Sequence, residues 1–287
     1  MDDYFSAKHS AKIVRWRLRR FVAAMKWGNG KLKQAPIIFG NAMPKSGSHL
    51  LTQVLHGLTS IGPFVDPGFP PVNRTEQNRP RSPDDILKDL QRMLPGDIRY
   101  GYLHAREPYI SVLTQPNWAT IFITRDPRDM LVSHVFYATE MNVSHGMHRY
   151  YMDQLTNMEE RLNAAIEGVK ETGFELASVK ERYDSYIDWL NRPEILPIRF
   201  EDLILDRKNT IERILNYLQR RGFTHILDIS EEISALESSI KPGKSGTFRK
   251  GQPGNWKEYF TDGNKKRFKE VAEDLLICLG YEKDNDW

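Results

Sequence analysis

The chain has 287 residues, of which 40 % are hydrophobic and 28 % charged, so it can bury a core and is not intrinsically disordered. Its formal net charge of +3 is too small to indicate a nucleic-acid partner. No apolar run approaches the roughly 20 residues that span a bilayer, and a single cysteine, Cys278, excludes an intramolecular disulfide.

Two terminal features follow from local patterns. The start of the chain is acidic, and its apolar residues are interrupted by Arg and Lys, so we expect no secretory signal and a cytoplasmic protein. Cys278 lies in an apolar run, 274–279, which predicts a small buried core residue.

Residues 8–27 are predicted to form a basic amphipathic helix, and we treat residues 1–35 as a segment that packs on a domain spanning 36–287. The apolar residues at helical spacing are Val14, Leu18, Phe21, Val22 and Met25. One interpretation packs this helix on the domain and leaves its basic face in water. The other places it on a membrane surface or a partner.

From residue 36 onwards, short apolar strands alternate with helices, which predicts an α/β fold: a single domain with a central parallel sheet flanked by helices. The expected strands are 36–40, 98–104, 118–124 and 195–200. The expected helices are 49–58, 130–137, 152–190 with a break near Gly173, 207–221 and 263–279. Residues 62–83 are expected to form a long loop because they are rich in Gly and Pro. Residues 241–255 are expected to form another because they are rich in Gly, Lys and Ser.

The segment Pro44-Lys-Ser-Gly-Ser48 lies between the first strand and the first helix of the domain. A helix N-terminus offers unpaired N–H groups and partial positive charge, and Lys45 adds a full charge. The pattern indicates a phosphate-binding loop, although Pro44 stands where a Walker A motif has its second glycine. Alone, this short loop does not establish such a site.

Two further segments carry cations in loops. In Arg125-Asp-Pro-Arg-Asp129, Arg125 follows a strand and Ser133 comes eight residues later, so both side chains can grip one phosphate. The alternative is a structural ion pair of Arg125 with Asp126 or Asp129. The segment 248–257 contains adjacent cations beside a glycine, which is either an anion clamp or a solvated loop.

Together, the three segments resemble the cytosolic-type sulfotransferases that use 3′-phosphoadenosine-5′-phosphosulfate (PAPS), over residues 36 to 261. The resemblance implies a P-loop-like sulfotransferase fold, PAPS as co-substrate, adenosine 3′,5′-bisphosphate (PAP) as product, and no metal. It implies that the 5′-phosphosulfate is bound by Lys45, Ser46, Gly47, Ser48 and His49. It also implies that the 3′-phosphate is bound by Arg125 and Ser133, with Phe248, Arg249, Lys250 and Gly251 closing over it.

The resemblance also implies the catalytic groups. His104 ends the second expected strand, 21 residues before Arg125, and corresponds to the family's catalytic base; the imidazole pKa lies near working pH. Lys45 is expected to neutralise the leaving phosphate oxygen during in-line transfer. Three positions depart from the family: Leu50 replaces an adenine-stacking Trp, Phe200 a Tyr, and Tyr102 a Lys. Leu50 and Phe200 are nevertheless expected among the cofactor-binding residues.

The acceptor is expected to be a small molecule with a hydroxyl or amine, bound near residues 62–83, residues 134–150 and the loop before Arg249. These stretches and their neighbours contain aromatic residues and carboxylates: Phe64, Phe69, Tyr137, Tyr150, Phe248, Asp66, Glu76, Glu107 and Glu140. The carboxylates favour a polar or alkaloid natural product, or they are solvated surface. The competing hypotheses are an ATP-dependent P-loop kinase, a non-catalytic nucleotide- or lipid-binding module, and a membrane-anchored carbohydrate sulfotransferase. The family's dimerisation segment is only partly present, at Lys257 and Thr261, so no oligomeric state is predicted.

Overall fold

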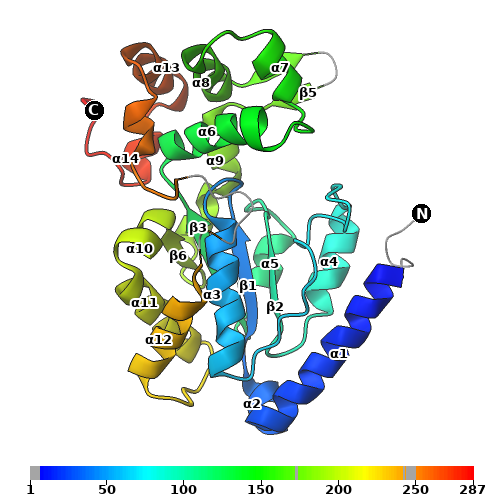
Figure 1. Ribbon diagram of the computed structural model, residues 1–287. Coiled ribbons are helices and arrows are strands. Elements are labelled where there is room, and N and C mark those ends of the chain that lie inside the picture. The colour runs from blue at the N-terminus through cyan, green and yellow to red at the C-terminus, as the bar shows by residue number, and fades with distance from the viewer. Residues whose placement is uncertain (1–6, 172–173, 242, 244–249) are drawn as a thin grey trace. The chain divides into compact units, whose positions relative to one another are not determined.

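The computed structural model describes residues 7–171, 174–241, 243 and 250–287. The fold divides into two compact units (Figure 1). The first comprises Met1–Thr124 and Asp188–Ser245, and the second comprises Arg125–Ile187 and Gly246–Trp287.

The first unit is built on a four-stranded parallel sheet with the order β2-β1-β3-β6. Its strands are β1 (Ile37–Ala42), β2 (Ile98–Gly101), β3 (Trp118–Thr124) and β6 (Leu196–Arg199). Every residue of β1 and β3 is buried, as expected for central strands of a parallel sheet covered on both faces. The predicted α/β class and the four predicted strands are therefore confirmed, although β2 ends three residues before His104.

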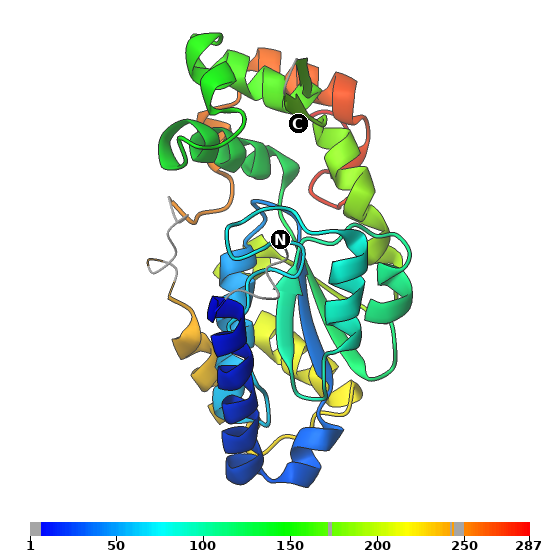
Figure 2. The same cartoon turned by 90° about the vertical axis from the view of Figure 1, so that its right-hand side faces the viewer.

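Helices cover both faces of this sheet, with α3 and α12 on one face and α4 and α5 on the other (Figures 1 and 2). Their bounds are α3 (Ser48–Ile61), α4 (Pro83–Gln91), α5 (Tyr109–Leu113), α10 (Phe200–Leu205), α11 (Arg207–Arg220) and α12 (Ile229–Ser239), with a 3₁₀ turn at Asp188–Asn191. One core cluster of buried residues joins the sheet to α3, α10, α11 and α12. The expected helices at 49–58 and 207–221 are confirmed, whereas α4, α5 and α12 lie where no helix was predicted.

The N-terminal helix α1 (Ala7–Trp27) is followed by a short α2 (Asn29–Gln34). Trp16, Ala23 and Trp27 face the first unit, where they pack around Leu32 and Val65. The Trp16 indole N–H and the Arg20 guanidinium both bind Asp97, at 2.9 Å and 2.6 Å. These contacts lie on the side of the helix opposite to its apolar stripe.

The apolar stripe of α1 was expected to be the docked face, and this expectation was wrong. Its members Val14, Leu18, Phe21, Val22 and Met25 are 55–73 % exposed. The reason is that Trp16, Trp27 and the ion pair of Arg20 with Asp97 hold the other side of the helix. The spacing of apolar residues in the sequence does not reveal these contacts.

The second unit is mostly helical. It contains α6 (Pro127–Phe136), a π-helix (Tyr137–Met141), α7 (His148–Asp153), α8 (Met158–Glu167), α9 (Val179–Ile187), a 3₁₀ turn (Asn255–Glu258), α13 (Asp262–Ala272) and α14 (Leu275–Cys278). The strands β4 (Val169–Glu171) and β5 (Phe174–Leu176) form a small antiparallel pair. Helix α8 packs against both α6 and α13.

The helical segment 152–190 is interrupted around the predicted break, although Gly173 itself lies outside the described residues. Two strands, β4 and β5, stand there, because α8 ends at Gly168, where φ is +82° and a Cβ would lie 2.6 Å from the Leu176 carbonyl oxygen. Two other expectations for this unit were wrong. The last helix is broken at Glu273, which has a φ of +50°. Cys278, expected to be buried, is exposed at the end of α14.

Candidate functional site

The loop between β1 and α3 has an unusual backbone. Lys45 and Gly47 both have positive φ, 66° and 92°, and the amide of Ser46 donates to the Met43 carbonyl at 3.2 Å. Left-handed backbone at a non-glycine residue costs about 1 kcal/mol, and such conformations concentrate at ligand-binding sites. Successive backbone amides turned in this way form an anion-binding concavity.

Gly47 is required at its position for two reasons. Its φ of +92° disfavours side chains, and a Cβ there would lie 2.6 Å from Cδ2 of Phe200 and 3.4 Å from Cδ1 of Ile123. Phe200 is buried at the start of α10. The structure therefore places the predicted Phe200 against the predicted Gly47, so that its ring supports the loop from beneath.

Several donors of this loop have no acceptor among the described residues. Gly47 is the N-cap of α3 and makes no side-chain cap bond. No backbone carbonyl in the described part of the chain accepts from the amides of Gly47, Ser48 or His49. The Ser46 hydroxyl is fully buried and has no hydrogen-bond partner among the described residues. Buried donors without acceptors are costly, so the loop fits an anion that would supply them.

The remaining predicted loop residues adjoin this cradle. Loss of hydration and the nearby Lys45 ammonium lower the pKa of His49, so its imidazole is neutral near pH 7. Leu50 does not line the surface; it is buried in the main core cluster with Val54 and Leu203. The positive charge of the loop therefore comes from Lys45 and from the helix N-terminus.

His104 lies just beyond β2 and is positioned by its buried neighbour Leu103. The Asn41 side chain of β1 makes two hydrogen bonds to the Leu103 backbone: its Oδ1 accepts from the Leu103 amide at 2.8 Å, and its Nδ2 donates to the Leu103 carbonyl at 2.9 Å. The Trp189 indole N–H donates to the same carbonyl at 2.8 Å. These contacts extend the β1–β2 pairing with side chains and fix the chain where His104 reaches the surface.

The electrostatic surroundings of His104 favour its neutral form. Loss of hydration and the Arg106 guanidinium both lower its pKa. A neutral imidazole near pH 7 is the form that accepts a proton.

Sequence reasoning treated Tyr102 only as a missing lysine, yet it contacts the anion-binding loop. Its hydroxyl lies 2.9 Å from the Ser48 hydroxyl, at the first residue of α3. Its backbone amide donates to the Asn73 side chain at 3.2 Å. Because Tyr102 and His104 are two residues apart, this contact joins the predicted base segment to the predicted loop.

The second unit begins with Arg125, directly after β3. The Arg125 side chain is 10 % exposed, and its guanidinium lies 3.9 Å from the Asp129 carboxylate, which is fully buried. The Arg125 carbonyl accepts from the Tyr183 hydroxyl at 2.8 Å. Ser133 lies on α6, as Asp129 does, and is half-buried. The structural ion pair considered from sequence is therefore present with Asp129.

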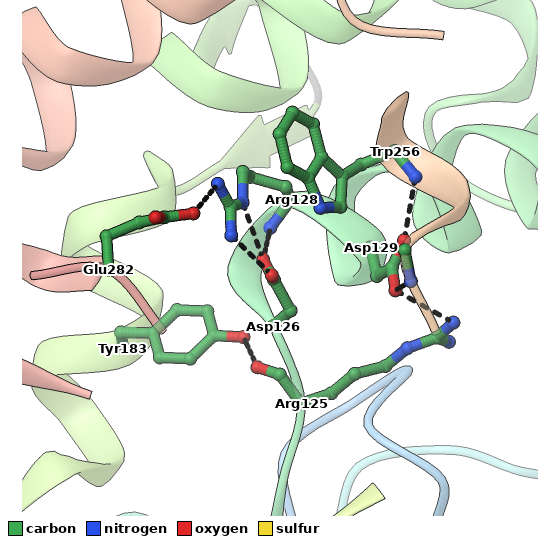
Figure 3. A network of polar contacts seen from close by, with 8 residues as sticks. Arg125, Asp126, Arg128, Asp129, Tyr183, Trp256 and Glu282 are labelled. Atoms are coloured by element: carbon green, nitrogen blue, oxygen red, sulfur yellow. Dashed lines mark hydrogen bonds and ion pairs between the residues drawn. The ribbon is translucent and has the colours of Figure 1, made fainter. Parts of the chain in front are cut away.

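Asp129 connects Arg125 to the C-terminal segment (Figure 3). Its carboxylate accepts from the backbone amides of Gly254 and Trp256, at 2.7 Å and 2.8 Å. Burial raises the pKa of Asp129, although the charge of Arg125 and these two amides act in the opposite direction. The glycine and tryptophan of the third predicted segment thus anchor that segment to α6.

A second ion-pair system on α6 was not predicted. Asp126 caps the helix and binds the Arg128 guanidinium at 2.7 Å, and Glu282 binds it at 2.5 Å (Figure 3). Burial lowers the pKa of Arg128, but the hydrogen bonds and charges of both carboxylates outweigh it and raise the pKa. The guanidinium also lies over the rings of Trp256 and Trp287, at 3.9 Å and 4.6 Å.

The remaining residues of the third segment are partly described. Phe248 and Arg249 lie outside the described residues. Lys250 is exposed, and its pKa is raised by its hydrogen bond to Glu258. Gly251 has a φ of +62°.

Several residues proposed for the acceptor pocket have structural partners. Phe64 is buried against Phe223, with ring centroids 5.1 Å apart. Asp66 binds His56 at 3.1 Å, and Glu76 binds Lys12 at 2.8 Å. Glu107 accepts from the Ser111 hydroxyl at 2.6 Å. These carboxylates therefore give no support to a cationic acceptor.

Metal ligands and membrane spans were also sought. In the described part of the chain, no group of three or more His, Cys, Asp or Glu residues is arranged to hold a metal ion. No described helix combines the length and apolar character needed to cross a bilayer.

Solved structures show where this fold is found. The crystal structure of mouse sulfotransferase SULT7A1 complexed with PAP has a TM-score of 0.61, with 18 % identity, over 88 % of this chain and 91 % of that chain. Retinol dehydratase in complex with androsterone and PAP has a TM-score of 0.54, with 16 % identity, over 90 % of this chain and 84 % of that chain. At these identities the likeness concerns the fold.

Curated relatives match a smaller part of the chain. The 3-alpha-hydroxysteroid sulfotransferase of Cavia porcellus is 24 % identical over 176 residues, covering 56 % of each chain. Sulfotransferase 2A6 of Mus musculus is 24 % identical over 171 residues, covering 55 % of this chain and 56 % of its own. The chain thus spans little more than half the length of these relatives. A sulfotransferase domain model, however, matches residues 38–280, so the chain belongs to the sulfotransferase family.

Proposed function

We propose that this chain transfers the sulfuryl group of PAPS to a hydroxyl, or an amine, of a small molecule. The observation that carries the proposal is the Pro44–Ser48 loop, whose two left-handed residues, uncapped helix N-terminus and buried, unpaired Ser46 hydroxyl suit an anion. Membership of the sulfotransferase family makes the 5′-phosphosulfate of PAPS the first anion to consider.

Family resemblance assigns PAPS, the sulfuryl donor, to the predicted site residues. The loop residues Lys45 to His49 would bind the phosphosulfate, and Arg125 and Ser133 would bind the 3′-phosphate. Lys250 and Gly251, with Phe248 and Arg249, would close over that phosphate. The position of Arg125 directly after β3 and the anchoring of Gly254 and Trp256 by Asp129 support this assignment.

In the proposed reaction, the acceptor oxygen attacks sulfur in line with the bond to the leaving phosphate. The new O–S bond forms, the S–O bond to the 5′-phosphate breaks, and His104 takes the acceptor proton, giving a sulfate ester and PAP. Lys45 would neutralise the charge that builds on the leaving oxygen. The lowered pKa of His104 keeps it ready to accept a proton.

Tyr102 would act as a positioning residue in this scheme. Its hydroxyl contacts Ser48 in the loop, and its backbone is two residues from His104. It therefore fixes the distance between the base segment and the phosphosulfate loop within the first unit.

The choice of acceptors to test rests on the names of the relatives and on the contacts of the predicted pocket's carboxylates. Curated relatives are named for hydroxysteroids, and three of the carboxylates that suggested an alkaloid, Asp66, Glu76 and Glu107, have other partners. A hydroxysteroid and a simple phenol are thus the first acceptors to test, with a cationic alkaloid beside them. PAPS carrying radioactive sulfur is incubated with each acceptor, and labelled product is counted for the wild type and for His104→Gln. We expect labelled product with the wild type and a loss of about 100-fold or more in the variant. Equal transfer by the variant would exclude His104 as the base.

A further inference from the structure

The N-terminal helix presents an apolar surface that the first unit does not cover. Val14, Leu18, Phe21, Val22 and Met25 lie on one side of α1 and are 55–73 % exposed. Figures 1 and 2 show this helix (dark blue) at the edge of the unit, with its outer side away from the sheet and its covering helices. Five large apolar side chains on one helix face form a contiguous patch, which on a soluble surface marks an interaction site.

The exposure is a property of a docked helix and not of a loose one. The inner side of α1 is held by Trp16, Ala23 and Trp27, and by the ion pair of Arg20 with Asp97. Lys12 adds an ion pair with Glu76 at 2.8 Å. The helix cannot turn its apolar stripe inward without breaking these contacts, so the stripe is held outward.

The charges around the stripe indicate what covers it. With 100° per residue, Arg15 and Lys26 border the stripe on one side and Arg17 borders it on the other, and all three are exposed. No Asp or Glu occurs between residues 7 and 27. A second copy of this helix would bring like charges together, whereas an anionic surface would neutralise them.

We propose that α1 attaches the chain to an anionic phospholipid surface. The helix would lie in the plane of the interface, with the apolar stripe among the acyl chains near the headgroups and the flanking cations at the phosphate level. This inference goes beyond the proposed function, because it involves no residue of the loops or of the base segment.

The test is co-sedimentation of the full chain with vesicles, which needs no enzymatic activity. One set of vesicles is pure phosphatidylcholine, and the other is an equal mixture of phosphatidylcholine and phosphatidylserine. The variant Leu18→Glu/Phe21→Glu changes two exposed residues and leaves the docked face intact. Leu205→Glu, at a leucine of α10 that is 75 % exposed, is the matched control. A third variant, Arg15→Ala/Arg17→Ala, tests the charges.

We expect the wild type and Leu205→Glu to bind the mixed vesicles in low salt and to be released by high salt. The Leu18→Glu/Phe21→Glu variant should not bind, and each removed arginine should weaken binding roughly fivefold. No binding to mixed vesicles, or equal binding by all variants, would overturn the proposal. So would sedimentation equilibrium that shows a dimer which Leu18→Glu/Phe21→Glu dissociates, because the stripe would then be a contact between copies.

Discussion

The substitution Gly47→Ala tests how the anion-binding loop is held. The new methyl group would need a left-handed backbone, at a cost of about 1–2 kcal/mol, and would lie 2.6 Å from the Phe200 ring. Overpacking of this kind costs a further 1–3 kcal/mol, so we expect a total loss of about 2–5 kcal/mol in unfolding free energy. If the loop moves to relieve the clash, PAP affinity falls as well.

Two other glycines of the same unit separate these effects. Gly222 has a φ of +101°, but a Cβ there would meet its nearest atom at 3.4 Å, so Gly222→Ala carries the backbone strain with little clash. Gly30 lies in α2 with open space around it, so Gly30→Ala should be neutral or slightly stabilising. Urea unfolding measures the unfolding free energy of all three variants, and titration with PAP measures the affinity of the loop for the nucleotide.

A double mutant isolates the contact with Phe200. Phe200→Leu replaces the aromatic ring that the new methyl group would meet by a smaller side chain. The double mutant Gly47→Ala/Phe200→Leu should therefore be more stable than the sum of the two single changes predicts. The reasoning is refuted if Gly47→Ala costs no more than Gly222→Ala and PAP binding is unchanged.

Three further predictions concern single side chains. Arg106→Gln removes a charge that lowers the pKa of His104, so the acid limb of the kcat/KM profile should move to higher pH, since the base is active only when neutral; an unmoved limb would exclude His104 as the titrating group. Asp129→Ala leaves Arg125 and two backbone amides without their acceptor, and thermal unfolding should show a loss of about 3 kcal/mol; a loss below that of an exposed-site variant would contradict this role. Tyr102→Phe should lower kcat with little change in PAP affinity, and rates equal to wild type would show that the contact with Ser48 is dispensable.

Much of the first unit is predictable from local pattern. The strands β1 and β3 are mostly apolar runs that are buried throughout, and the Pro44–Ser48 loop stands out by its glycine and lysine before a helix. The left-handed backbone of Lys45 and the contact between Gly47 and Phe200 cannot be predicted from local pattern. The contact with Gly47 depends on α10, which follows the loop by more than a hundred residues.

Contacts between distant segments explain the remaining errors. The docked side of α1 is decided by Asp97, and the third predicted segment is anchored by Asp129 instead of lying free as a loop. Arg128 drew no functional interpretation, because its partners Trp256, Glu282 and Trp287 are near the end of the chain. A second arginine beside the predicted phosphate ligand was the signal that could have pointed to this network.

If the proposed function is right, the chain binds a nucleotide that carries phosphates at both the 3′ and 5′ positions. Calorimetric titration with PAP, beside AMP and ATP–Mg²⁺, measures this binding, with Arg125→Ala as the variant and Leu205→Glu as the control. We expect PAP to bind far more tightly than AMP without added metal, and Arg125→Ala to lose most of this preference. Tighter binding of ATP–Mg²⁺, with no effect of Arg125→Ala, would exclude the proposed PAP site and favour a kinase.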